Sequence, residues 1–189
     1  MRSFKTKIKR EIIFLLGSCL LLSATFLNMF PLIKVDNLSE KDGNQDHRGL
    51  HGAYFNNSMT PIYIDGDATG VGAHNWTWAV NQPWCSGSGT WNDPYVIKNI
   101  MIDGKGTENC IEIRDSSVPF IIRNTSLYDA SSANYKAAIR LDHVNNSLII
   151  ENNCSNNGHI GIILYEHCNN NTIKRNIMHD NQNAGISLR

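Results

Sequence analysis

Two similar five-residue segments near the C-terminus carry side chains that bind metals and transfer protons. They are DHVNN and EHCNN, which begin at Asp142 and Glu166, and each places a histidine beside a carboxylate. If the segments stack, His143 lies over His167 and Asp142 over Glu166, with the imidazoles about 5 Å apart. Imidazoles beside carboxylates suit Zn²⁺ or Cu²⁺. An ordinary polar turn explains the same residues without a metal.

Whether these segments stack depends on a repeat that runs through the second half of the chain. Four segments, VIKN, IIRN, IIEN and IKRN, follow one another at similar spacings and end in Asn99, Asn124, Asn152 and Asn176. A second series, CIEI, AIRL, GIIL and GISL, interleaves with the first. In the second series two apolar residues flank one position, which is the period-2 pattern of a strand with one buried face.

Two short strands per period of about 24 residues, separated by turns rich in Asn, Gly, Ser and Asp, predict a solenoid. The chain would climb one strand spacing, about 4.8 Å, per coil and bury Ile and Leu inside. Asparagine tolerates left-handed backbone angles, and stacked amides hydrogen-bond along the coils. We therefore expect an all-β parallel β-helix over residues 95–189, with the four asparagines forming a ladder at its corners.

The pattern I-x-x-N, GI-x-L and NN-x-I-x-x-N resembles the repeats of right-handed parallel β-helix proteins of the pectin-lyase-like superfamily. It looks most like the NosD-type and related PbH1-repeat proteins. The resemblance covers residues 95–189 well and residues 61–94 loosely, and it implies about four right-handed coils. Because this scaffold carries lyases, hydrolases, epimerases and binding proteins, the resemblance implies a fold more than a function.

The resemblance also implies what catalytic residues would look like. Polysaccharide lyases of this fold are associated with acidic Ca²⁺ ligands and a basic residue that takes a proton, and related hydrolases use paired aspartates. Glu112 and Arg114 on one strand, with Arg140 on the next coil, point outward by alternation and could line a groove. A solvated face with cross-strand ion pairs is the favoured explanation of these residues, because no paired-Asp or lyase-like Arg motif is present.

Residues 61–94 precede the regular repeat and contain one strand-like segment, TPIYIDGD, followed by four tryptophans, Trp76, Trp78, Trp84 and Trp91. Such a segment could cap the first coil, which would otherwise expose its apolar interior. The alternative is an aromatic platform on which sugars stack. A disulfide could join Cys85 in this segment to Cys110 in the first coil, although four cysteines outside the leader allow three connectivities.

The N-terminus has the composition of a targeting segment. A basic stretch precedes an uncharged, mainly apolar run at positions 12–33. This pattern predicts either a cleaved secretory signal or a transmembrane signal-anchor within residues 1–35, and both interpretations stay open. Residues 36–60 have little apolar periodicity and are interpreted as a linker. The last expected strand stops at Arg189 inside a coil, so we expect either that the repeat is incomplete at this end or that something covers it.

Charge narrows the range of partners. After residue 35 the chain carries 11 basic and 16 acidic residues, a net charge of −5, which argues against nucleic acid as a partner. We expect an exported or cell-surface module that is structural or binds a polysaccharide or surface glycan, without a catalytic site in these residues. The alternatives are an enzyme acting on acidic polysaccharide, with possible Ca²⁺, and a NosD-type copper-handling accessory protein.

Overall fold

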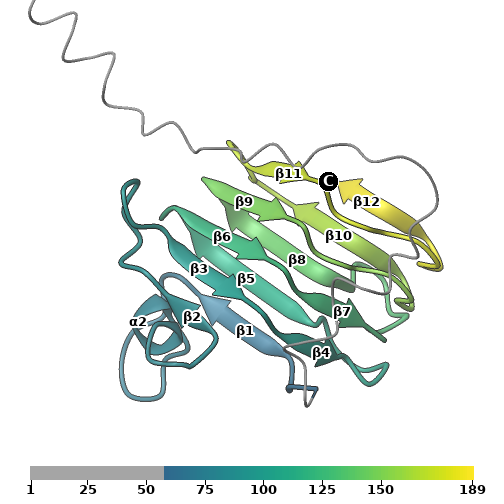
Figure 1. Ribbon diagram of the computed structural model, residues 1–189, viewed down its shortest axis with the longest axis horizontal. Helices are drawn as coiled ribbons and strands as arrows, with labels where there is room; N and C mark the ends of the chain where they lie inside the picture. Colours follow the sequence, from purple (N-terminus) through teal and green to yellow (C-terminus); the bar gives the residue numbers. More distant parts are fainter. Residues whose placement is uncertain (1–57) are drawn as a thin grey trace, which may run out of the picture. The chain divides into compact units, whose positions relative to one another are not determined.

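The computed structural model describes residues 58–189, in which the chain winds into a parallel β-helix (Figure 1). The predicted leader, residues 1–35, and nearly all of the predicted linker lie outside this part of the chain. No helix within residues 58–189 is long and apolar enough to cross a membrane. The all-β coiled architecture that the repeat predicts is confirmed.

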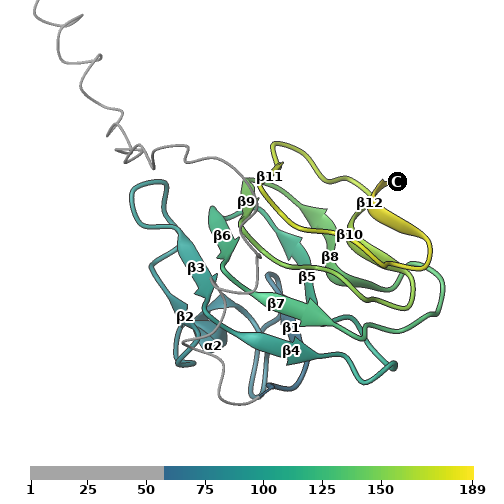
Figure 2. The ribbon, with the colours of Figure 1, turned by 45° about the vertical axis from the view of Figure 1, so that its right-hand side comes forward.

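Three sheets run along the solenoid. Sheet 1 is fully parallel and contains β1 (Ile62–Asp65), β5 (Ile111–Ser116), β8 (Ala137–Val144), β10 (Ile160–Tyr165) and β12 (Ala184–Leu188). Sheet 2 contains β3 (Tyr95–Lys98), β6 (Phe120–Arg123), β9 (Ser147–Ile150) and β11 (Thr172–Lys174), with β2 (Cys85–Ser86) antiparallel at one edge. Sheet 3 pairs β4 (Met101–Asp103) with β7 (Ser126–Tyr128). The coils that contain β4 and β7 pass through sheets 2, 3 and 1 in that order, as Figure 2 shows. In the following coils sheet 3 is reduced to isolated bridges from Asn153 to Ser126 and Ile177.

The interior is a stack of equivalent aliphatic side chains. In sheet 1, Ile113 pairs with Leu141 and Leu141 with Leu164, while in sheet 2 Ile122 pairs with Ile149. All five are buried. Because side chains alternate along a strand, this register sends every second residue inward and leaves its neighbours on the outer face. Burial of these stacked side chains supplies the main stabilisation of the coils.

The corner after sheet 2 is built from asparagines, but they do not form the single ladder that the spacing predicted. Asn99 and Asn124 both have left-handed backbone angles, and Asn124 Nδ2 donates to Asn99 Oδ1 at 2.8 Å. Asn152 instead aligns with Thr125, whose N–H and O–H donate to Asn152 Oδ1. Asn152 then donates to Asn176 Oδ1 at 3.0 Å. Two adjacent ladders therefore replace the predicted one.

Strand register explains this difference. Ile122 of β6 pairs with Ile149 of β9, and the same offset carries Asn124 to Glu151 and not to Asn152. Glu151 accordingly occupies the left-handed site, with φ 57°, and Asn152 lies one position beyond it. Asparagine serves both positions because it tolerates positive φ at the first and can satisfy buried backbone groups at the second.

Amide ladders also occur at corners that the sequence interpretation did not single out. Asn170 Nδ2 donates to Asn146 Oδ1 at 2.6 Å, and Asn157 Nδ2 donates to Asn181 Oδ1 at 3.0 Å. Asn157 Oδ1 in turn accepts the Ala130 N–H of the preceding coil at 3.0 Å. The abundance of asparagine in this chain is thus explained by hydrogen bonding between coils.

The segment between β1 and β3 covers the first coil. Its helix α2 (Trp76–Ala79) is N-capped by Asn75, whose side chain accepts the Trp78 N–H at 3.0 Å, and lies with β2 beside β1 in Figure 1. Trp76 and Trp84 are buried in the core, and Trp76 stacks on Tyr95. These two tryptophans are therefore unavailable to a sugar, because their rings pack as a cap. Trp78 is half-buried and stacked on a histidine. Trp91 is 71% exposed.

The disulfide considered between Cys85 and Cys110 is not formed. All four cysteines of residues 58–189 are free thiols. Cys85 belongs to the edge strand β2, whereas the Cys110 thiol donates to the backbone oxygen of Tyr128 in sheet 3 at 3.3 Å. Burial raises the pKa of Cys85 to about 11 and that of Cys110 to about 12. These thiols fill the interior as small apolar side chains.

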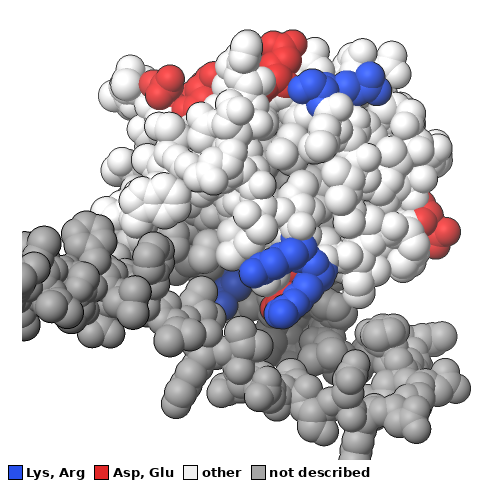
Figure 3. Space-filling view, turned by 90° about the horizontal axis from the view of Figure 1, so that it is seen from above, with Lys and Arg blue, Asp and Glu red and all other residues white. Residues whose placement is uncertain are grey.

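The coil containing β11 and β12 forms the face seen in Figure 3, which carries few charged side chains across its centre. β12 pairs with β10 along one edge. Its apolar side chains are correspondingly less covered than those of inner strands, and Leu188 is 70% exposed. Stacking between coils therefore weakens toward this end of the described residues.

Candidate functional site

The outward side chains of sheet 1 form a regular array, which we call the outer face. Strand pairing arranges them in two rows across four strands: Tyr63, Glu112, Arg140 and Ile163, and Asp65, Arg114, Asp142 and Tyr165. Glu112, Arg114 and Arg140 lie here as the alternation predicted. The same pairing places opposite charges next to each other, Glu112 beside Arg140 and Arg114 beside Asp142. Sheet geometry thus brings together residues from four successive coils.

Asp142 is the centre of the polar network on this face. Its Oδ2 accepts from Arg140 Nη2 at 3.0 Å and lies 3.5 Å from Arg114 Nη2, and its Oδ1 lies 2.8 Å from His143 Nδ1. The Asp142 side chain is only 3% exposed. Burial alone would raise the pKa of Asp142, but hydrogen bonds from Arg140 and His143 and the two guanidinium charges outweigh it, so the pKa is lowered. The carboxylate is therefore ionised and held rigidly.

The structure corrects the predicted partner of Asp142. The repeat spacing placed it over Glu166, but the register of β8 and β10 pairs Asp142 with Tyr165, one position earlier. The chain regains the spacing of the repeat at the corner, where Glu166 and His167 both take left-handed angles. Asp142 consequently belongs to the outer face as well as to the histidine corner. The two candidate sites predicted separately form one continuous surface.

Aromatic side chains border the network, and the sequence interpretation missed them. Tyr135 comes from the insertion before β8, and its ring centroid lies 5.4 Å from that of Tyr165. Arg140 lies over the Tyr165 ring at 4.4 Å and donates to the backbone oxygen of Tyr135 at 3.0 Å. Tyr63 and Tyr135 are each 41% exposed. Tyr165 follows directly after GIIL, so the alternation of that strand predicts that its side chain points outward. Tyr135 lies outside the strands, so no sequence pattern predicts its position.

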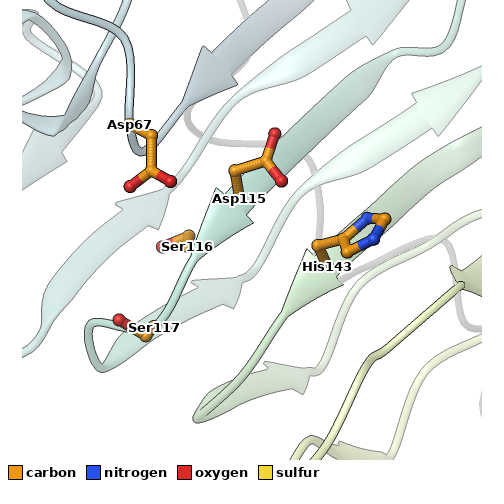
Figure 4. A pocket seen from close by; sticks show the side chains of 5 residues that line it. All are labelled: Asp67, Asp115, Ser116, Ser117 and His143. Carbon is orange, nitrogen blue, oxygen red and sulfur yellow. The ribbon is translucent and has the colours of Figure 1, made fainter.

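A shallow hollow of about 240 Å³ lies at the end of the outer face, lined by Asp67, Asp115, Ser116, Ser117 and His143. Figure 4 shows these side chains at the ends of three adjacent strands, β1, β5 and β8. Ser116 is already engaged, because its hydroxyl accepts the Trp76 indole N–H at 2.8 Å. The hollow therefore offers two carboxylates, one hydroxyl and one imidazole to a ligand.

His143 and His167 lie together at the corner after sheet 1. Their ring centroids are 4.9 Å apart and the rings are inclined by 45°. Of the two carboxylates predicted beside them, Asp142 contacts His143 Nδ1 through Oδ1 while its Oδ2 binds Arg140. The Glu166 carboxylate instead lies beside the Tyr165 phenol and raises the pKa of Tyr165. No group of three or more His, Cys, Asp or Glu side chains within residues 58–189 is arranged to hold a metal ion.

The geometry of the coils agrees with a comparison to known families. The family described as the right handed beta helix region matches residues 84–189. The chain belongs to this family. The right-handed coiling that the resemblance implied is thereby confirmed, while the narrower resemblance to NosD-type and pectin-lyase-like proteins stays a prediction. No curated protein and no solved structure matches the chain significantly.

Proposed function

We propose that this chain is an exported or cell-surface β-helix module that binds a glycan on the outer face of sheet 1. One observation carries the proposal: exposed tyrosine rings border an ordered network of guanidinium and carboxylate groups on sheet 1. Aromatic rings stack on the apolar faces of sugar rings, and planar charged groups form paired hydrogen bonds with hydroxyls. The outer face supplies both kinds of group.

The network is ordered before any ligand arrives. Arg140 is fixed by Asp142, by the Tyr135 backbone and by the Tyr165 ring. A preorganised surface loses little conformational entropy on binding, which favours affinity from a modest contact area. Two arginines are balanced by Glu112 and Asp142, so the face has little net charge. This balance favours a neutral, hydroxyl-rich glycan over a polyanion.

Location at the cell exterior rests on the sequence. The basic stretch followed by residues 12–33 and the net charge of −5 in the remainder support export. Protease treatment of intact cells that produce the tagged chain tests this directly. Loss of the tag supports an exterior location, whereas protection until the cells are lysed contradicts it.

Binding is tested with the full chain on an array of neutral and acidic polysaccharides. Tyr63→Ala and Tyr135→Ala, which remove the two exposed rings, are each expected to weaken binding by about tenfold or more, the usual cost of truncating an aromatic anchor. Trp91→Ala is the matched control, because Trp91 is exposed but lies outside the outer face. Absence of glycan binding, or equal loss with Trp91→Ala, would contradict the proposal.

An enzyme acting on acidic polysaccharide is the second candidate, and the hollow favours it. The His143 imidazole, hydrogen-bonded to ionised Asp142, faces a hollow with Asp67 and Asp115, where Ca²⁺ could assist. Arg114 and Arg140 are poor proton acceptors because both pair with Asp142. Incubation with acidic glycans, with Ca²⁺ or a chelator, tests for unsaturated or reducing-end products. Product that His143→Ala abolishes would favour the enzyme over the binding module.

A further inference from the structure

The histidine corner has the spacing that a shared metal ion needs. The centre of a ligating imidazole ring lies about 3.2 Å from the metal, which is a zinc–nitrogen distance of about 2.1 Å plus ~1.1 Å within the ring. When the nitrogen–metal–nitrogen angle is roughly 90–109°, the centroids of two such rings are therefore roughly 4.5–5.2 Å apart. The rings of His143 and His167 have centroids 4.9 Å apart. They extend from equivalent corners of successive coils, so the backbone holds this spacing. Small rotations about the side-chain bonds would aim one nitrogen of each ring at a common point.

Asp142 fixes which nitrogen of His143 is available. Nδ1 of His143 lies 2.8 Å from Asp142 Oδ1, and because a carboxylate oxygen accepts this hydrogen bond, Nδ1 carries the proton. The lone pair of Nε2 is then free, and 41% of the His143 side chain is exposed. A ligating histidine commonly donates its other N–H to a carboxylate, which orients the ring and raises its basicity. His167 is exposed, and no carboxylate bond determines which of its two ring nitrogens can bind the metal.

We propose that His143 and His167 together bind one divalent first-row transition ion, Zn²⁺ or Cu²⁺, through one nitrogen each. Asp142 acts as the orienting partner, and water fills the other coordination positions. With two protein ligands the site is moderate in affinity, and Cu²⁺ binds more tightly than Zn²⁺ by the usual order of stability. The open positions lie beside the outer face, where an oxygen of a bound ligand could enter. The site does not depend on the proposed glycan function.

The chain contains a matched control for this site. His179 Nδ1 contacts Asp180 Oδ2 at 2.8 Å, the same distance as His143 to Asp142. No second imidazole among residues 58–189 stacks on His179. A His179→Ala variant therefore removes an exposed histidine and its carboxylate contact without touching the proposed pair.

The experiment is calorimetric titration of the full chain with ZnCl₂, followed by electron paramagnetic resonance of the Cu²⁺ complex. We expect one tightest site per chain with two nitrogen ligands to copper. His143→Ala and His167→Ala should each lower the metal affinity of this site by more than the ~10–100-fold that is typical of losing an orienting partner. Asp142→Asn, which removes only the orienting partner, should lower the affinity by about tenfold. Circular dichroism confirms that each variant remains folded.

Two results would overturn the proposal. One is a wild-type chain that shows no stoichiometric Zn²⁺ or Cu²⁺ binding. The other is equal loss of affinity in His179→Ala and His143→Ala, which would mean that scattered histidines bind the ion. Nitrogen chemical shifts give an independent readout: Zn²⁺ should move Nε2 of His143 while its Nδ1–H stays bonded to Asp142, and an unmoved Nε2 signal also contradicts the site.

Discussion

Replacing Asn152 by alanine is the sharpest test of the amide ladders. Asn152 is buried, and its side chain forms four hydrogen bonds that join three coils. Oδ1 accepts from the N–H and O–H of Thr125, and Nδ2 donates to the Ile122 carbonyl and to Asn176. Alanine keeps the backbone conformation but removes every one of these bonds. The loss of stability in this variant therefore measures the contribution of the Asn152 side-chain hydrogen bonds.

The expected cost follows from those partners. A net contribution of about 1 kcal/mol per hydrogen bond already gives several kcal/mol, and buried groups left without partners cost about 1–3 kcal/mol each. Thr125 and Ile122 are fully buried, so water cannot readily replace the amide. We expect Asn152→Ala to lower the free energy of unfolding by about 3–5 kcal/mol, a large fraction of the ~5–15 kcal/mol typical of a domain.

Equilibrium unfolding in urea, followed by circular dichroism, measures this cost. Asn153→Ala is the matched control, because the neighbouring Asn153 has a buried Oδ1 without a hydrogen-bond partner. Its replacement should change stability by less than about 0.5 kcal/mol. A cost below about 1 kcal/mol for Asn152→Ala, or an equal cost for the two variants, would refute the view that side-chain amides hold successive coils together.

Trp76→Ala should destabilise by about 3–5 kcal/mol because the ring fills the cap, whereas exposed Trp91→Ala should change stability by less than about 0.5 kcal/mol; urea unfolding compares them. Gly66→Ala should lower the free energy of unfolding by about 1–3 kcal/mol, because a Cβ would clash with the backbone carbonyl at the end of β5. At Gly185 an added Cβ meets only ordinary contacts, so Gly185→Ala is the control, and equal melting temperatures for the two variants would contradict this expectation. Because the folded pKa of Asp142 is lowered, its stabilisation is present above about pH 4 and lost as pH falls further. Asp142→Asn should flatten that part of the stability profile, and an unchanged profile would show that Asp142 does not cause it.

Much of the candidate site followed from local pattern. Alternation in CIEI and AIRL predicted that Glu112, Arg114 and Arg140 face outward together, and the repeat predicted that His143 and His167 lie about one strand spacing apart. Both arrangements depend only on the period of a strand and the climb of a coil, which are fixed by backbone geometry. Alternation also assigns Tyr63 and Tyr165 to the outer face, whereas Tyr135 lies outside the strands and carries no periodic signal.

The sequence by itself determined that the chain forms a parallel coil with aliphatic residues inside and asparagines at its corners, because a repeated local pattern has one economical way to bury its apolar face. Only the tertiary structure decided which residues meet across coils. Two left-handed residues at the corner after β10 absorb a change of register, so Asp142 meets Tyr165 and not Glu166. A shift of one residue in a strand exchanges the buried and outer faces, and repeat spacing cannot locate the corner that absorbs it.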